Sequence, residues 1–471
     1  MNQPNLLFVF ADQWRRMAMG CAQQDAVLTP NMDSFAAQSI YCTNAISTFP
    51  LCSPHRACLF TGRWPHANGV FTNCKPGLSV RMQDSEICIG QVLKENGYQT
   101  GYIGKWHLDE PEINHQEAPA SGARNWDAYT PPGVRRHGFD FWHSYGACDE
   151  HLTPHYWNDT EEKVEIDKWS PEHETDVAID YLQNCDKTKP FSLFVSWNPP
   201  HSPYNQVPSR YLDLYRDKEL PLRANVDYHN IHHHTTETAN LNTPEELMQV
   251  TREYFAAVSG LDDQFARLLK TLEEQGLREN TIVVLTADHG DMMGSHALMA
   301  KHVWYEESVG IPFVIGGAGL QAGVCNTTIG SADVAPTLLS LLQLPIPPQM
   351  QGIDRAAEIK AHTVQDDSFT YLYATPGGPG LLGPLKQAGI DPRSIGWRGI
   401  RSPRYTYIAD AGYTPQSKLR RLLYDLQEDP YQLNPQEITD LAQNAVAKKM
   451  EQQLQKWLLQ QQDDFRFRLN A

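Results

Sequence analysis

The sequence predicts an α/β fold in which a large mixed, mostly parallel sheet is sandwiched by helices and is followed by a smaller C-terminal α+β domain with an antiparallel sheet and a helix. The first observation behind this prediction is the alternation of Val-, Ile- and Phe-rich runs with helical stretches, which is typical of a parallel sheet covered on both faces. The second is a change in the sequence pattern near residue 365, after which short predicted strands are separated by turn residues. The third is that four of the five apolar runs end in polar residues that could carry chemistry.

The strands expected in the main sheet are continuous apolar runs bounded by polar residues. They cover residues 5–11, 99–104, 191–197, 281–287 and 311–315. Helices are expected between them at residues 32–39, 85–95, 175–184 and 247–275. Ligands of such sheets bind beyond the carboxyl ends of the strands, so the residues that follow these runs mark a candidate site. These residues are Asp12-Gln13, Lys105-Trp106-His107, His201 and Asp288-His289.

Two long polar segments are expected to be surface excursions over the active face. Residues 111–169 are rich in Pro, Gly, Trp and His, and residues 220–243 contain a histidine run at 228–234. Loops in such a position usually shape substrate access, although the histidine run could alternatively bind a transition metal. We place the catalytic domain at residues 1–365 and the smaller domain at residues 366–471. The smaller domain is expected to have strands at 369–373, 399–408 and 422–426 and a final helix at 437–461.

Composition and charge argue against several classes of function. The formal net charge of −17 disfavours a nucleic-acid partner, and no apolar run approaches the length of a membrane span. Nine cysteines at irregular spacings make a poor disulfide framework, so most are expected to be buried thiols. The chain enters an apolar strand at once and shows no signal peptide. We therefore expect a cytoplasmic location for the chain as given, or a periplasmic or secreted one if the natural N-terminus is longer. The oligomeric state stays open.

Residues 50–63 combine a cysteine, a helix start and an arginine. Ser53 is a good N-cap and Pro54 a good first helical residue, which would place Cys52 just ahead of a helix N-terminus. The unpaired N–H groups and the dipole at such an end favour a tetrahedral anion, and Arg56 could point its guanidinium at the same place. A lone cysteine is more often an inert buried thiol, but Cys-x-Pro-x-Arg is too specific a pattern for that interpretation alone.

The pattern resembles the nucleophile motif of the type I, formylglycine-dependent sulfatases of the alkaline phosphatase-like superfamily. Further matches to family motifs are Thr61-Gly62-Arg63, residues 29–33, Gly104-Lys105-Trp106-His107 and residues 422–430, so the resemblance covers nearly the whole chain. It implies that a formylglycine-generating enzyme oxidises Cys52 to formylglycine. The hydrated aldehyde carries two hydroxyls, one of which attacks sulfur while the other later loses its proton so that sulfate is expelled.

The resemblance also implies a role for each residue at the strand ends. Lys105 would bind sulfate, and His107 would contact the nucleophile and serve as base in the elimination. His201 would protonate the leaving oxygen, because an imidazole titrates near neutrality. Lys301 would neutralise the leaving oxygen, and Asp288 would be the base for the attacking hydroxyl. The expected catalytic set is Cys52, Arg56, Lys105, His107, His201, Asp288 and Lys301.

A divalent cation is expected next to the nucleophile. Its ligands would be Asp12, Gln13, Cys52 (through the formylglycine oxygen), Asp288 and His289. Taken alone, an aspartate at a strand end is usually a turn residue. The family usually binds calcium, which is the first expectation, but many members have Asp-Asp and Asn where this chain has Asp12-Gln13 and His289. Fewer carboxylates and an imidazole leave magnesium or manganese as alternatives. Asp291 and His296 could orient a ligand or merely cap a turn.

The leading hypothesis is a sulfatase that acts on a carbohydrate sulfate ester, because the long Trp-, Gly- and His-rich loops would suit a sugar pocket. Residues 12–15 also resemble phosphonate monoester hydrolases, so a phosphonate or phosphate ester is an alternative, as is an aryl or choline sulfate. A non-catalytic sulfate- or glycan-binding protein is the third class, and it would not require the full catalytic set. Trp397-Arg398 and Arg401 could border the pocket, although strand packing is the default interpretation.

Overall fold

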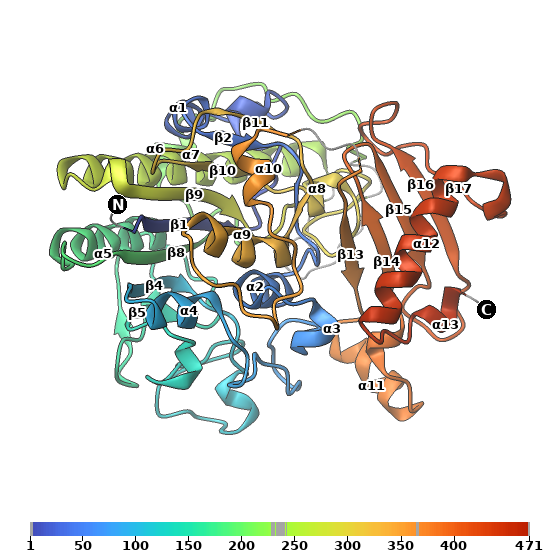
Figure 1. The fold of residues 1–471 in the computed structure, drawn as a ribbon, viewed down its shortest axis with the longest axis horizontal. Helices are drawn as coiled ribbons and strands as arrows, with labels where there is room; N and C mark the ends of the chain where they lie inside the picture. The colour runs from blue at the N-terminus through green and yellow to red at the C-terminus, as the bar shows by residue number, and fades with distance from the viewer. Residues whose placement is uncertain (1–2, 228–230, 232–240, 242, 364–366, 470–471) are drawn as a thin grey trace.

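The central feature of the molecule is an eight-stranded sheet in the order β11-β2-β10-β9-β1-β8-β4-β5 (Figure 1). The computed structural model describes residues 3–227, 231, 241, 243–363 and 367–469. In chain order the strands of this sheet are β1 (Asn5–Asp12), β2 (Ile40–Cys42), β4 (Gln99–Lys105), β5 (Phe141–Tyr145), β8 (Phe191–Pro200), β9 (Thr281–Ala287), β10 (Phe313–Gly316) and β11 (Gly323–Cys325).

The prediction of a mixed, mostly parallel sheet is confirmed. Five of the seven neighbouring strand pairs are parallel, and the two antiparallel pairs both involve β10. The central strands β1, β8 and β9 are buried along their whole length, which explains why they appear in the sequence as uninterrupted apolar runs.

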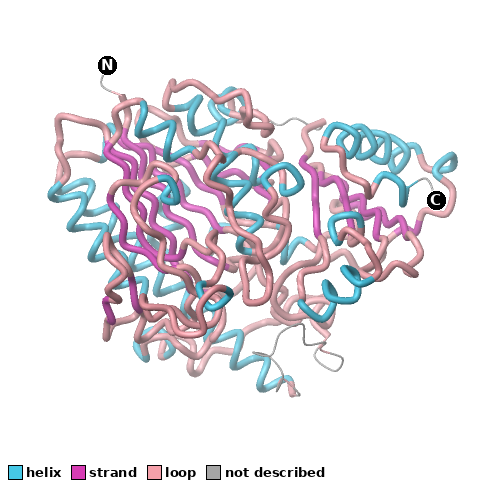
Figure 2. Tube along the Cα trace, turned by 90° about the horizontal axis from the view of Figure 1, so that it is seen from below, coloured by secondary structure: helices cyan, strands magenta, loops and turns pink. Residues whose placement is uncertain are grey.

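Helices cover both sides of this sheet, as Figure 2 shows. The long helices α5 and α7 pack against each other and against β8, whereas α2 packs with α4 and α9. The α-helices of this part are α1 (Pro30–Ala37), α2 (Cys52–Thr61), α3 (Pro65–Asn68), α4 (Ile89–Glu95), α5 (Ser170–Asn184), α6 (Ser209–Leu212), α7 (Pro244–Glu274), α8 (Glu306–Val309), α9 (Val334–Leu341) and α10 (Ala356–Lys360). Two small sheets pair β3 (Ala45–Ile46) with β12 (Ile329–Gly330) and β6 (His155–Tyr156) with β7 (Val164–Glu165).

A second, antiparallel sheet follows in the order β13-β14-β15-β16-β17. Its elements are β13 (Thr370–Ala374), α11 (Pro379–Gln387), β14 (Trp397–Arg401), β15 (Tyr405–Asp410), β16 (Arg420–Asp425), β17 (Gln436–Glu437), α12 (Ala445–Gln460) and α13 (Arg466–Leu469). The single strand predicted at 399–408 is wrong, because a tight turn after Arg401 divides it into β14 and β15. The last helix begins at Ala445 rather than near 437, because the Asn444 side chain caps it.

The second sheet shares its apolar core with the segment that precedes helix α2. Ile46, Phe49 and Leu51 belong to the same buried cluster as Trp397 and Trp457. The backbone N–H of Tyr373 in β13 also donates to the carbonyl of Thr48. The C-terminal part is therefore packed directly behind the predicted nucleophile segment. The boundary placed at residue 365 stays a prediction.

The two predicted excursions have different outcomes. The segment 111–169 is not only a surface loop, because it contributes the edge strand β5, which pairs with β4, and the small strands β6 and β7. Nearly all of the histidine run at 228–234 lies outside the described residues. None of the described helices combines the length and the apolarity that crossing a membrane requires.

Candidate active site at the ends of the central strands

Neighbouring strands of the main sheet deliver the predicted polar residues to one place. β1 ends at Asp12 and pairs in parallel with β9, whose last residue, Ala287, lies opposite Ala11. The N–H of Asp288 donates to the carbonyl of Ala11, 3.1 Å away, so the two aspartates leave the sheet side by side. In the same way β4 ends at Lys105, and β8 ends one residue before His201. The prediction that these strand ends meet is confirmed.

Two site residues have backbone conformations that non-glycine residues adopt only rarely. Gln13 has a φ of 66° and His107 a φ of 52°. A side chain in this left-handed region costs free energy, which the surrounding structure must supply. Gln13 comes one residue and His107 two residues after a strand end, and both line the pocket that the site opens into.

Helix α2 begins two residues earlier than the sequence suggested. Cys52 is its first residue and Leu51 its N-cap, so the expectation that Ser53 caps the helix is wrong. The Ser53 hydroxyl instead donates to the carbonyl of His107 at 2.7 Å and accepts from the N–H of Cys74 at 3.1 Å. Ser53 thus ties the start of α2 to the loop after β4, and it fixes Cys52 relative to Lys105 and His107.

Arg56 contacts both aspartates of the charged group near Cys52. Its guanidinium is fully buried and lies 3.1 Å from Asp12 Oδ2 and 3.2 Å from Asp288 Oδ2. It also donates to the carbonyl of Lys105 at 2.6 Å. The arginine therefore holds both aspartates in place from behind.

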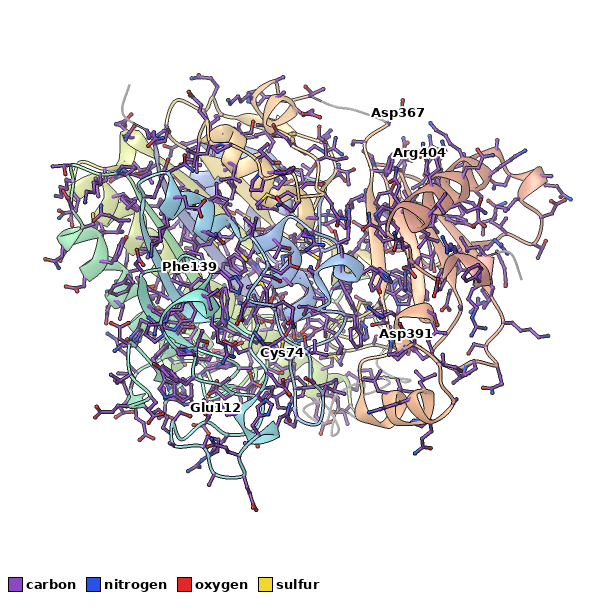
Figure 3. All side chains as sticks on the ribbon, turned by 60° about the horizontal axis from the view of Figure 1, so that its bottom comes forward. Cys74, Glu112, Phe139, Asp367, Asp391 and Arg404 are labelled. Atoms are coloured by element: carbon purple, nitrogen blue, oxygen red, sulfur yellow. The ribbon has the colours of Figure 1, made fainter. Side chains whose placement is uncertain are left out.

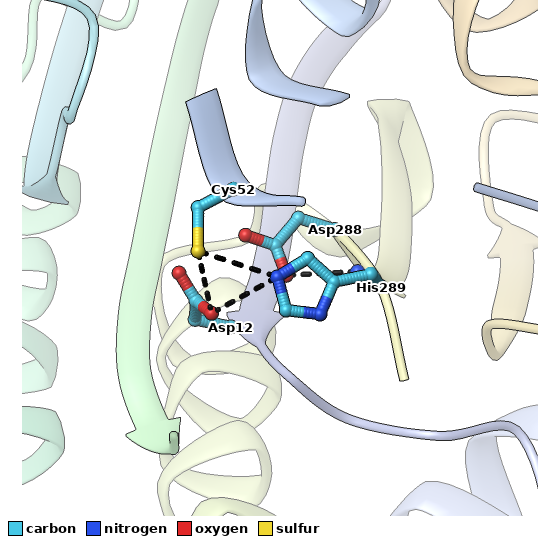
Figure 4. Close-up of side chains that lie close together, drawn as sticks. All are labelled: Asp12, Cys52, Asp288 and His289. Carbon is cyan, nitrogen blue, oxygen red and sulfur yellow. Dashed lines mark hydrogen bonds and ion pairs between the residues drawn. The ribbon is translucent and has the colours of Figure 1, made fainter. Parts of the chain in front are cut away.

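Asp12, Cys52, Asp288 and His289 form a compact group of potential metal ligands (Figure 4). One ligand atom from each lies within 4.8 Å of all the others, and all four side chains are buried. The Sγ of Cys52 is 3.3 Å from His289 Nε2 and 3.5 Å from Asp12 Oδ1. The four residues come from three strand or helix ends, which explains why no local motif contains them together.

One atom of each ligand residue is directed at the centre of the group. The Oδ2 atoms of Asp12 and Asp288 face Arg56, whereas their Oδ1 atoms each lie 3.5 Å from His289 Nε2. Nδ1 of His289 lies 3.0 Å from the carbonyl of Gly290, which places the ring proton there and leaves the Nε2 lone pair facing the group. Burial lowers the pKa of His289 well below its ordinary value, so the ring is neutral.

The two aspartates have pKa shifts of opposite direction. Burial alone would raise the pKa of Asp12, but Lys105, His201 and Arg56 outweigh it and hold the carboxylate ionised. Burial, reinforced by the negative charge of Asp12, raises the pKa of Asp288 to about 7. Arg56 and Lys105 lower the pKa of Asp288 but do not offset burial and the charge of Asp12, and a divalent cation at the group would add the positive charge that favours ionisation.

Gln13 presents its amide oxygen to the site because its nitrogen is fixed by two residues. Nε2 of Gln13 donates to Asp291 Oδ2 at 2.5 Å and to the Tyr204 hydroxyl at 3.1 Å. The amide oxygen accepts from Lys301 Nζ. Of the two residues considered as orienting groups, Asp291 acts as one, whereas His296 stacks on Tyr305 at a ring distance of 3.7 Å. Tyr204 gave no signal in the sequence.

Two lysines approach the site from opposite directions. Lys105 Nζ lies 2.7 Å from Asp12 Oδ2 and 2.9 Å from Asn198 Oδ1. Asn198 in turn donates to the carbonyl of Cys148 at 2.6 Å and so joins β8 to the loop after β5. Lys301 reaches the group through Gln13. Asn198 was missed by the sequence analysis, although it lies only three residues before His201.

The two predicted acid–base histidines flank this arrangement. His107 Nε2 lies 3.1 Å from the carbonyl of Cys74, and its buried Nδ1 has no partner among the described residues. Burial and then Lys105 lower the pKa of His107 well below its ordinary value, so Nδ1 carries a free lone pair. His201 Nδ1 lies 2.7 Å from the carbonyl of Ser202. Burial, Lys301 and Lys105 lower the pKa of His201 to about 4.

A pocket of about 1410 Å³ opens above these residues. Its floor includes Cys52, Lys105, His107, His201 and Lys301. One wall comes from the 111–169 segment, with Arg124 and Trp126, and another from the C-terminal part, with Leu381 and Tyr413. The pocket is therefore deep enough for one group at the floor and wide enough for a larger molecule above it.

Arg398 and Arg401 do not line the pocket. Arg398 is buried against Asp463 at 2.7 Å, and Arg401 is buried against Glu306 at 2.8 Å. The default interpretation of these residues as packing partners is therefore confirmed. Every residue of the predicted catalytic and metal sets, by contrast, lies on the pocket floor or in the polar network beneath it.

Comparisons with known proteins agree with this geometry. A family model described as Sulfatase matches residues 4–344. The chain is 37% identical to the endo-4-O-sulfatase of Bacteroides thetaiotaomicron, with 92% of this chain and 87% of the relative covered. It is 33% identical to the ulvan-active sulfatase of Formosa agariphila, with 92% and 76% covered.

Solved structures give the same result for the fold. A Bacteroides thetaiotaomicron protein, solved in work on the metabolism of multiple glycosaminoglycans, superposes with a TM-score of 0.85 at 33% identity, with 99% of this chain and 98% of that chain covered. The phosphonate monoester hydrolase of Agrobacterium radiobacter superposes with a TM-score of 0.75 at 21% identity, with 97% and 96% covered. The latter likeness extends to the fold alone.

Proposed function

The chain belongs to the sulfatase family and is a sulfuric ester hydrolase, and from this premise we propose that it removes a sulfate group from a carbohydrate. The observation that carries the proposal is the convergence of Cys52 and two lysines on the floor of one pocket, with three further potential metal ligands grouped around Cys52. A sulfate ester has one anionic group to hold and one oxygen to release, and this floor offers cations for the first and histidines for the second.

Cys52 is poorly suited to act as a thiol. Burial and the charge of Asp12 raise its pKa to about 12, so the sulfur is protonated and weakly nucleophilic at neutral pH. We propose that Cys52 is converted to formylglycine by a formylglycine-generating enzyme, a partner that the family resemblance implies. The hydrated aldehyde supplies a hydroxyl oxygen at the position of the sulfur, 3.3 Å from His289 Nε2.

The residues present fit a divalent cation. Two carboxylate oxygens, the Nε2 lone pair of His289 and the position of the Cys52 side chain face one another, and Gln13 presents its amide oxygen at the rim. When bound, the cation would lower the pKa of the attacking hydroxyl and attract a sulfate oxygen. Calcium is the first candidate because four of the five positions offer oxygen once Cys52 is formylglycine, and the imidazole keeps magnesium and manganese as alternatives.

Sulfate binding and proton transfer would be carried out by side chains of the protein. Lys105 and Lys301 lie on the pocket floor and would hold the sulfate oxygens, while Arg56 keeps both aspartates in register. His107 would accept a proton at its unpartnered Nδ1. His201 would donate a proton to the leaving oxygen. In the free protein Lys301 and Lys105 contribute to the low pKa of His201. The negative charge of a bound sulfate would offset these lysines and raise the pKa of His201, so that the ring can carry the proton.

A carbohydrate is favoured over a small aryl or choline ester by the size and lining of the pocket. Its volume of about 1410 Å³ exceeds the need of a single small group, and its walls combine an indole ring with charged side chains. Two relatives at 33% identity or more are named for sulfatase activity on saccharide positions or on ulvan. The phosphonate ester alternative has support from the fold and from the resemblance of residues 12–15.

The test is a substrate panel with the mature enzyme. The chain is coexpressed with a formylglycine-generating enzyme, and conversion of Cys52 is followed by the mass of its tryptic peptide. Activity is measured on sulfated mono- and disaccharides, 4-nitrophenyl sulfate and a phosphonate monoester. We expect sugar sulfates to have the highest kcat/KM, Cys52→Ala to be inactive, and the matched buried cysteine variant Cys58→Ala to remain active. A preparation that is active with an unmodified Cys52 thiol would falsify the nucleophile assignment.

A further inference from the structure

Lys75 is a cationic residue of the pocket for which the described part of the chain supplies no counter-charge. It lines the pocket and is partly buried, yet no ion pair joins it to any carboxylate in the described part of the chain. Burial is the only cause acting on its pKa, which is lowered to about 8. A cation that is partly desolvated and unpaired costs free energy, and an anion brought by a ligand would recover it.

An indole ring lies next to this lysine. Nζ of Lys75 is 5.6 Å from the centre of the Trp126 ring, and the ring of His107 is 6.0 Å from the same tryptophan. Trp126 is 39% exposed, although it is a large aromatic on a wall of the pocket. The three residues therefore lead outward from the catalytic floor: the acid–base histidine, an open aromatic face, and then a free ammonium group. This spacing suits a sugar ring stacked on the indole with an acidic group directed at the lysine.

The chain segments that carry these two side chains are anchored before any ligand arrives. Asn73 and Cys74 precede Lys75 in the chain. Asn73 forms a hydrogen bond with Ser53, and Cys74 forms hydrogen bonds with Ser53 and His107. Trp126 is followed by the buried Asp127, whose Oδ1 accepts from the N–H groups of Ala128, Gly146 and Ala147. Figure 3 shows Cys74 near the centre of the molecule, between Glu112 of the 111–169 segment and Asp391 of the C-terminal part. A preformed site loses less conformational entropy on binding, and it keeps a fixed distance from the reacting sulfate.

The C-terminal part closes the other side of the lysine. A Cβ atom at Gly377 would lie only 3.8 Å from Lys75 Nζ and 2.6 Å from the Thr72 hydroxyl oxygen. The carbonyl of Gly377 accepts from that hydroxyl at 3.3 Å. Trp126 and Gly377 thus both lie close to the ammonium group, and an anion can reach it from the pocket that Lys75 lines.

We infer that Lys75 and Trp126 form a subsite for a second acidic group on the substrate, carried by the sugar next to the sulfated one. This inference rests on the proposed function and extends it to a substrate class: a saccharide with at least two anionic groups. The acidic group is either the carboxylate of a uronic acid or a second sulfate, since both are oxyanions that an ammonium group can bind.

The test compares substrates that differ only in this acidic group. Three disaccharides carry the same reactive sulfate on one sugar and differ in the other sugar. In the first the other sugar is a uronic acid, and in the second that uronic acid is reduced to the neutral sugar. In the third this neutral sugar carries a second sulfate. The readout is the ratio of kcat/KM for each anionic disaccharide to that for the neutral one. Wild type should favour the anionic substrates about tenfold or more, as expected for one charged hydrogen bond. The difference should appear mainly in KM, and the two anionic arms identify which acidic group is bound.

Two variants then assign the preference to Lys75. Lys75→Met should reduce the ratio to about one, and Lys75→Arg should retain most of it. The matched control is Lys163→Met, which alters a lysine of the same pocket that is already paired with Glu165 at 3.0 Å; its ratio should stay near that of wild type. Trp126→Ala should raise KM for all three disaccharides, because stacking does not depend on charge.

The outcomes separate this inference from the proposed function. A wild-type enzyme that hydrolyses sugar sulfates with equal kcat/KM on anionic and neutral disaccharides overturns the subsite alone. The same holds if Lys75→Met lowers activity equally on all three, or if it leaves the ratio unchanged. A wild-type enzyme without activity on any sugar sulfate overturns the proposed function and the subsite together.

Discussion

Two buried arginines in this molecule look alike but have different surroundings. Arg398 in the C-terminal part is matched by one carboxylate: Asp463 lies 2.7 Å away, and the remaining donors reach backbone carbonyls such as that of Ala374. Arg56 beneath the pocket lies between two carboxylates, which also face Lys105 and the neutral ring of His289. The first arrangement is saturated, whereas the second has a carboxyl group with a raised pKa, and Nδ1 of the neighbouring His107 has no partner among the described residues.

The difference shows how a structural ion pair and a functional one can be distinguished without reference to conservation. A structural pair balances its charges within the protein, because a buried unpaired charge is costly. A functional group leaves charge and lone pairs unbalanced, so that a cation and an anionic substrate complete it. Both arginines are fully buried, so burial alone does not separate them.

The strongest test of this comparison removes one carboxylate from the functional group. Asp12→Asn should lower kcat/KM on a sugar sulfate by about four orders of magnitude, because several kcal/mol of cation binding and nucleophile activation are lost. The free energy of unfolding should change by less than about 2 kcal/mol. In this variant Arg56 still forms its ion pair with Asp288, and Lys105 still donates a hydrogen bond to Asn198. Steady-state kinetics, calorimetric titration of calcium into the chelated protein and urea denaturation measure the three effects. Wild-type activity in Asp12→Asn, or in the metal-stripped enzyme, would remove the metal site from the mechanism.

His201 sharpens the comparison by separating proton donation from charge. His201→Ala should lower kcat/KM by about two to four orders of magnitude on a sugar sulfate, whose alkoxide needs a proton, but far less on 4-nitrophenyl sulfate, whose phenolate does not. Lys105→Ala is the matched control, because both substrates use its charge through the sulfate, and it should lower both values similarly. Equal losses on the two substrates for His201→Ala would leave His201 as a binding residue only.

The buried ion pair between Arg398 and Asp463 should affect stability strongly and activity little. Asp463→Asn leaves the guanidinium of Arg398 buried without a counter-charge and should reduce the free energy of unfolding by about 3 kcal/mol or more. The kcat/KM of the protein that remains folded should stay within about threefold of wild type, because neither residue lines the pocket. Urea denaturation with activity per folded molecule checks both statements. A large loss of kcat/KM at unchanged stability would show that the charge balance of this pair does not mark it as structural.

The pH dependence of stability is the smallest expected effect. Burial alone would raise the pKa of Glu306, but Arg401 and Arg16 outweigh it and lower the pKa to about 2. Because the pKa is lower in the folded state than the ordinary value of 4.5, the stabilisation is complete above pH 4.5 and is lost as the pH falls towards 2. The loss should be about 3 kcal/mol. Unfolding free energies between pH 5 and 3 should therefore decline less steeply in Glu306→Gln than in wild type. Parallel curves would place the acid sensitivity elsewhere.

The sequence alone predicts five of the eight strands of the main sheet and the chemistry at their ends. Buried parallel strands must be apolar throughout, so 5–11 and 281–287 were visible as runs, and the residues after them had to meet at one edge of the sheet. The Cys52–Arg56 pattern identified the nucleophile segment because its spacing within a helix is local. The lysines and histidines of the expected catalytic set were found through motifs of the same local kind.

Only the tertiary structure decided which polar side chains face one another. Tyr204 and Asp291 orient the Gln13 amide across 191 and 278 residues of chain, and no local pattern encodes such contacts. The same reason explains the misplaced cap at Ser53, the strand β5 within the 111–169 segment, and the packing role of Arg398 and Arg401. Lys75 and Trp126 are also unremarkable in the sequence, since an unpaired charge beside an open ring exists only once the chain has folded. Burial and charge balance are properties of three-dimensional neighbourhoods, and they decide here which residues support the fold and which act on a substrate.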